Sequence, residues 1–182
     1  RGGVVKRLFK DYATCAGVWA RQAQDEGHTR GRHMFFYGKV IYSYGLHFPM
    51  GRILDGMVLL NDSTHSVATS KHQREVQRAM LGANIDRGWV FYVSTGTLLV
   101  WDTSGSKAVY RDYAARIKHD LAKARLPRKR HATKLRLYQE CVSNMNVCLR
   151  FASLRGESVP VMLTDDETRE YQLAAAKVEL GV

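Results

Sequence analysis

The spacing of apolar residues changes near residue 104 of this 182-residue chain, and this change constrains the fold most. Before it, short apolar runs lie between Gly, Pro, Asn and Asp, which is typical of strands and hairpins. After it, apolar residues recur every three or four positions, as in amphipathic helices. The sequence therefore predicts a single α+β domain over 1–182, with an antiparallel β-meander and hairpins in the N-terminal half and a helical C-terminal half. We expect a soft division near residue 104, between a β-rich part (1–104) and a helical part (105–182).

The N-terminal half is predicted to combine two helices with short antiparallel strands. The first helix has apolar residues at helical spacing, and Thr69 or Ser70 can cap the second. The expected helices are 4–23 and 70–80, and the expected strands are 34–37, 40–44, one within 47–54, 57–60, 89–94 and 97–101.

Three helices are predicted in the C-terminal half. Ser106 can cap the first, and Pro127 ends it because proline cannot continue a helix. Thr164 and Glu167 form a capping box at the start of the last helix, which ends at Gly181. The expected helices are 107–126, 129–152 and 165–180, and the expected strand is 159–163.

Basic residues are concentrated in one segment. The formal net charge is +11, and residues 107–136 contain eleven Lys or Arg against two Asp, whereas residues 157–182 contain six acids against two bases. Such a concentration of positive charge favours binding to a polyanion, most often nucleic acid. Contacts with backbone phosphates fit this charge better than base readout. The alternative is a solvated helix that only confers solubility. The predicted nucleic-acid-binding residues are Arg111, Lys118, Arg125, Arg128, Lys129, Arg130 and Lys134.

Other site classes find little support in the sequence. The three cysteines form no CxxC motif and are expected to be buried in a reducing cytosol. No apolar run has the length of a membrane span. Metal-ligand spacing, a Walker loop and a GxGxxG motif are also missing, so the sequence predicts no metal site and no cofactor.

One resemblance covers roughly residues 15–80. The stretch Tyr42-Ser43-Tyr44-Gly45-Leu46-His47-Phe48-Pro49 is followed by Ser66, Thr69 and His72. These residues resemble an uncharacterised bacteriophage domain family with Tyr-Ser-Tyr-Gly-x-His-Phe-Pro and Ser-x-x-Thr-x-x-His patterns. The resemblance implies a phage or prophage origin, and with it the cytoplasm of a bacterial host cell as the location, and it assigns no activity.

The same stretches raise the alternative of a metal-independent enzyme acting on phosphodiesters. His47 and His72 could serve as general base and general acid, with Tyr44, Ser66 and Thr69 positioning the substrate. A structural reading is favoured, in which these residues cap helices and hold loops through hydrogen bonds.

The sequence therefore favours a phage-encoded nucleic-acid-binding module that contacts DNA or RNA phosphates over the enzymatic alternative. A third reading is an anti-defence or host-takeover protein whose basic face docks on an acidic host protein, and a phage protein is also a possible partner.

Overall fold

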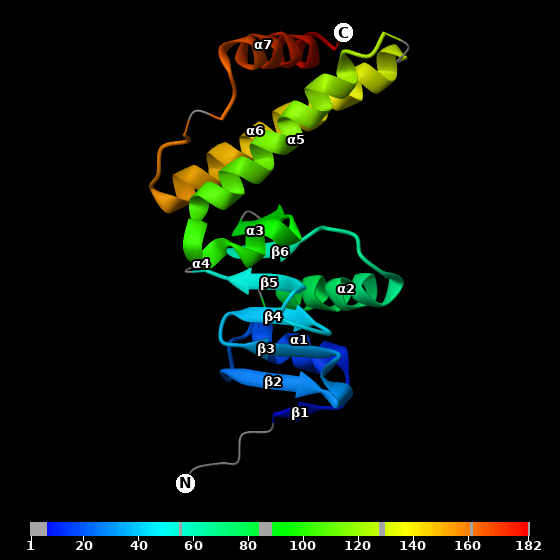
Figure 1. Cartoon of the computed structure of the whole chain (residues 1–182), viewed down its shortest axis with the longest axis vertical. Helices are drawn as coiled ribbons and strands as arrows, with labels where there is room; N and C mark the ends of the chain where they lie inside the picture. Colours follow the sequence, from blue (N-terminus) through cyan, green and yellow to red (C-terminus); the bar gives the residue numbers. More distant parts are fainter. Residues whose placement is uncertain (1–6, 55, 84–88, 128–129, 161, 182) are drawn as a thin grey trace. The chain divides into compact units, whose positions relative to one another are not determined.

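The computed structural model describes residues 7–54, 56–83, 89–127, 130–160 and 162–181. The chain forms two compact units, Arg1–Thr103 and Ser104–Val182, and each is described by itself. Strands occur in the first unit and helices dominate the second, so the α+β class is confirmed (Figure 1). The expectation of a single domain stays a prediction.

The first unit is built on a seven-stranded mixed sheet whose strands lie in sequence order (Figure 1). Strands β2 to β6 pair antiparallel, whereas β1–β2 and β6–β7 pair parallel. The strands are β1 (Leu8–Phe9), β2 (Glu26–Thr29), β3 (Met34–Tyr37), β4 (Val40–Ser43), β5 (Pro49–Ile53), β6 (Val58–Asn61) and β7 (Val90–Val93).

Helices α1 (Tyr12–Ala20) and α2 (Val67–Gly82) connect the two parallel strand pairs, because parallel neighbours need a crossover. The two helices pack on each other and share a core with the sheet. Gly51 of β5 allows this packing, because a Cβ atom there would lie 3.0 Å from the Trp19 ring. Trp19 is fully buried as a result.

Three expectations for this unit are wrong. Within the predicted helix 4–23, β1 precedes α1, and the carboxylate of Asp11 accepts a hydrogen bond from the Thr14 amide to cap the helix. Ser66, not Thr69 or Ser70, caps α2 by accepting from the Thr69 amide. The predicted hairpin over 89–101 contains only β7.

Two short helices, α3 (Thr95–Leu99) and α4 (Trp101–Ser104), replace the second strand of that hairpin. Ser94 starts α3 by accepting a hydrogen bond from the Thr97 amide, so a local cap outweighs the hairpin pattern. Strand β2 was not predicted, because its sequence Glu-Gly-His-Thr has no apolar alternation.

The second unit consists of α5 (Ser106–Ala124), α6 (His131–Arg155) and α7 (Asp165–Leu180). Helices α5 and α6 run side by side in opposite directions, and α7 packs against both (Figure 1). Buried residues of all three helices meet in one core, where Ile117 and Cys141 are fully buried.

The capping box at Thr164 and Glu167 is confirmed, but Gly105 rather than Ser106 precedes α5. The described residues of the predicted strand 159–163 form no strand. None of the described helices is long and apolar enough to cross a membrane.

Candidate functional site

A buried hydrogen bond connects the two motifs of the N-terminal half. Ser43 ends β4 and His72 lies on α2, and the Ser43 Oγ atom is 2.7 Å from His72 Nδ1. Both residues are 1% exposed. Burial, followed by the charges of His33 and Lys71, lowers the pKa of His72 below its usual value. The neutral imidazole is therefore the favoured form, and it acts as a fixed hydrogen-bonding group.

Aromatic and imidazole rings surround His72. The ring of Tyr12 lies 4.2 Å from the His72 ring, and that of Tyr44 lies 5.3 Å from it. Tyr44 also contacts the ring of His33 at 5.1 Å, and the Tyr12 hydroxyl reaches His33 Nδ1 at 3.5 Å. These rings close over His72 and keep water from it.

Of the predicted catalytic residues, Tyr44 and His72 lie in ring contact, and His72 is closed off from solvent. His47 is exposed on the β4–β5 loop, whereas His72 is buried and bonded to Ser43. The Ser66 hydroxyl is 2.7 Å from the Thr69 hydroxyl at the start of α2. Tyr44 is half exposed and takes a left-handed backbone conformation (φ +58°) that non-glycine residues rarely adopt. The arrangement therefore gives His72 a structural partner in Ser43, whereas His47 lies exposed on a loop.

Sequence reasoning missed Ser43, Tyr12 and His33 as members of this cluster. Ser43 stands between two tyrosines in the quoted motif, but its partner lies 29 positions away. The pairing of β3 with β4 places Ser43, the last residue of β4, opposite Met34. His33 directly precedes Met34 in the chain. The hydrogen bond also requires α2 to pack in the same unit, so the local sequence does not identify Ser43 as the partner of His72.

The predicted nucleic-acid-binding residues fall into three groups. Arg128 and Lys129 lie outside the described residues. Lys118 and Arg125 form ion pairs with α7. The other three form no ion pair with a described residue, and they are Arg111, Arg130 and Lys134.

Helix α7 neutralises part of the basic face of α5. Lys118 Nζ lies 3.1 Å from the Glu167 carboxylate. The guanidinium of Arg125 forms two hydrogen bonds with Glu170, of which the Nε bond is 2.7 Å. Bidentate pairs of this kind are the stronger form of a surface ion pair. The acidic C-terminal segment therefore offsets the charge of two cations that the sequence assigned to a nucleic-acid surface.

Five cations of the segment have no acidic partner among the described residues, and we call them the open cations. Residues 107–136 contain eleven Lys or Arg, of which nine are described. Four of the nine form ion pairs, with acids on α5, α6 or α7. The remaining five form none with a described residue, and they are Lys107, Arg111, Lys123, Arg130 and Lys134.

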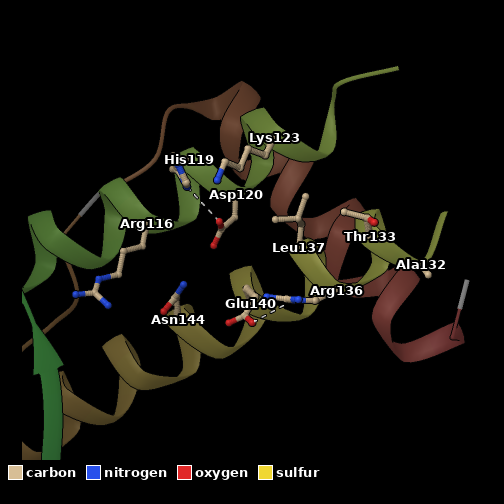
Figure 2. Close-up of a pocket in the computed structure, with 10 residues that line it drawn as sticks. All are labelled: Arg116, His119, Asp120, Lys123, Ala132, Thr133, Arg136, Leu137, Glu140 and Asn144. Atoms are coloured by element: carbon tan, nitrogen blue, oxygen red, sulfur yellow. Dashed lines mark hydrogen bonds and ion pairs between the residues drawn. The ribbon is translucent and has the colours of Figure 1, made fainter. Parts of the chain in front are cut away.

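A groove of about 670 Å³ runs between α5 and α6 (Figure 2). Figure 2 shows Lys123 and Asp120 of α5 facing Glu140 and Arg136 of α6. Arg136 lies 4.0 Å from Glu140, and both are largely exposed, so this pair contributes little to stability. Because cations and carboxylates line the groove together, it does not concentrate one sign of charge.

The Glu157 carboxylate contacts the N-terminal end of α5. Glu157 accepts hydrogen bonds from Ser106 Oγ at 2.8 Å, Tyr110 Oη at 3.0 Å and Arg155 Nε at 3.2 Å. Burial alone would raise the pKa of Glu157, but these hydrogen bonds together lower it. The hydrogen bond to Glu157 fixes the orientation of the Tyr110 side chain, which is 4% exposed.

Among the residues that the structure describes, no group of three or more His, Cys, Asp or Glu side chains could hold a metal ion. The three cysteines are buried and free. No family model, no curated protein and no solved structure matches the chain.

Proposed function

We propose that this chain is a phage-encoded module that binds DNA or RNA by contacting phosphates through the open cations of α5 and α6. The observation that carries the proposal is the uneven pairing of charge. The acids of α7 compensate only Lys118 and Arg125 among the described residues, and the open cations keep their charge at or near the surface. Phosphate binding needs such cations, since the release of counterions from the nucleic acid drives the association.

The position of the open cations agrees with backbone contact. Lys107 and Arg111 lie one turn apart on α5, and Arg130 and Lys134 lie one turn apart at the start of α6. Long side chains at these positions can reach successive phosphates without reading bases. The proposed place of action is the cytoplasm of a bacterial host, as the phage resemblance implies. The enzymatic alternative has weaker support, because His72 is shielded and holds Ser43.

The test compares two variants with the same net charge. In the first, the five open cations are replaced by Gln. In the control, five exposed cations of the first unit are replaced by Gln: Lys10, Arg21, Arg30, Lys71 and Arg74. Binding of a labelled duplex is then measured by fluorescence anisotropy over a range of salt concentrations.

We expect the first variant to bind the duplex much more weakly and the control to keep most of its affinity. The slope of log affinity against log salt decreases by about 0.9 for each duplex phosphate that the protein no longer neutralises, hence by up to about 4.5. An equal decrease in both variants would contradict the assignment to α5 and α6. Salt-independent binding would contradict phosphate contact altogether.

A further inference from the structure

A small pocket lies beside two of the open cations. Its volume is about 310 Å³. Helix α5 forms one wall, and Pro160 and Met162 form the other. The lining residues are Lys107, Tyr110, Arg111, Ala114, Pro160 and Met162.

The inner surface of this pocket is apolar and held in place. The Tyr110 hydroxyl donates to Glu157 at 3.0 Å, and the ring packs edge-on against Phe151 at 5.8 Å. The Met162 sulfur accepts a hydrogen bond from the Cys148 thiol at 3.6 Å. Aromatic rings and thioethers make favourable contacts with other flat rings. The pocket is therefore suited to a planar apolar group.

The rim of the pocket is positively charged. Lys107 and Arg111 are exposed and form no ion pair with a described residue, although Arg111 Nε donates to the Lys107 carbonyl at 3.3 Å. The nearby Glu157 is compensated, since Arg155 lies 3.2 Å from its carboxylate. Further along the same face of α5, α7 neutralises Lys118. Uncompensated charge on this face is thus found next to the apolar pocket.

We propose that the pocket receives one base of a single-stranded nucleic acid while the flanking phosphates bind Lys107 and Arg111. This inference rests on the proposed function and adds the type of strand. A nucleotide combines a flat ring with a phosphate a short distance away, and the pocket offers an apolar wall with cations at its mouth. Bases of a duplex are paired and stacked, whereas unpaired bases can insert between protein side chains.

The first experiment uses the unaltered protein. Fluorescence anisotropy compares a labelled thymidine oligonucleotide of about 12 nucleotides with an abasic oligomer of the same length. Both probes carry the same phosphates, so only the base can distinguish them. We expect the thymidine probe to bind about 5- to 150-fold more tightly, the factor given by one base-stacking contact. Equal affinity for both probes would overturn the proposal.

The second experiment fills the pocket. Ala114→Leu places three further carbons where the Ala114 methyl lines the pocket, and Ala122→Leu makes the same change at an exposed position of α5. We expect Ala114→Leu to abolish the preference for the thymidine probe without weakening abasic binding, and Ala122→Leu to change neither. Circular dichroism checks that each variant is folded. If Ala114→Leu does not fold, the comparison of the thymidine and abasic probes on the unaltered protein decides.

The outcomes separate this proposal from the one on which it rests. If the abasic oligomer binds with strong salt dependence but bases add nothing, phosphate contact stands and the base pocket fails. If neither probe binds but the duplex does, the base pocket fails alone, and if the duplex does not bind either, both fail. Polyglutamate and unlabelled thymidine oligomer are compared as competitors against the thymidine probe. If polyglutamate displaces the probe at the same concentration as the thymidine oligomer does, the base adds nothing, which would point to an acidic protein partner and overturn the base pocket.

Discussion

Replacing Ser43 with Ala should destabilise the first unit, because it leaves His72 Nδ1 without its hydrogen-bond partner. The two atoms are 2.7 Å apart, and both residues are 1% exposed, so water cannot take the place of the hydroxyl. A buried polar group left without a partner costs about 1–3 kcal/mol. For a unit of about 100 residues, this corresponds to a melting temperature lower by roughly 5–20 °C.

Tryptophan fluorescence can follow this unit separately, since the three tryptophans of the chain, Trp19, Trp89 and Trp101, all lie within it. Thr64→Ala is the matched control. It removes an exposed hydroxyl from the same unit and should change stability by less than about 0.5 kcal/mol. If Ser43→Ala melts at the same temperature as Thr64→Ala, the hydrogen bond does not stabilise the fold and the reasoning is refuted.

The same hydrogen bond predicts a dependence on pH. The pKa of His72 in the folded chain is lowered from its ordinary value of 6.5, chiefly by burial. Its contribution to stability is therefore complete above that value and decreases as the pH falls through it, because the unfolded chain then binds a proton that the folded chain excludes. His72→Phe should therefore make the urea midpoint of unfolding less dependent on pH in this range. An unchanged pH dependence would show that another group causes it.

Three further outcomes are expected. Glu167→Gln combined with Glu170→Gln frees the two cations that α7 neutralises, so nucleic-acid binding should tighten and its salt slope should steepen by up to about 1.8, whereas Glu179→Gln, on the exposed side of α7, should leave the slope unchanged. Burial raises the pKa of each cysteine thiol to about 11 or 12, so a thiol reagent should label the protein only after unfolding, and rapid labelling of the native chain would contradict this. Glu157→Ala should cost about 1–3 kcal/mol by urea unfolding, because it leaves the buried Tyr110 hydroxyl without an acceptor, and Tyr110→Phe should cost less, because it leaves no donor behind.

Local sequence signals identified several elements of the fold. The hairpin of β3 and β4 was predicted from two β-rich runs around Gly38, and the structure confirms it. The capping box at Thr164 was predicted because both of its hydrogen bonds join residues three positions apart. Signals of this kind join residues that are close in the sequence, so they are present in the sequence itself.

Elements that depend on distant pairing were missed. The parallel pairing of β6 with β7 requires α2 to cross over, and nothing near residue 90 distinguishes such a strand from one arm of a hairpin. The N-cap of α2 was missed for a similar reason. Three hydroxyl residues near its start can each act as a cap, and only the folded helix shows that Ser66 does.

The candidate surfaces divide in the same way. The sequence determined that basic and acidic residues occupy separate segments of the C-terminal half, since this depends on composition alone. Only the tertiary structure decided which cations are compensated, because Lys118 and Arg125 meet acids 45 or more positions away once α7 packs against α5. It also decided that Ser43 and His72 meet out of reach of water. Coulomb energy and hydrogen bonding depend on distance in space, and folding alone sets that distance for residues far apart in the chain.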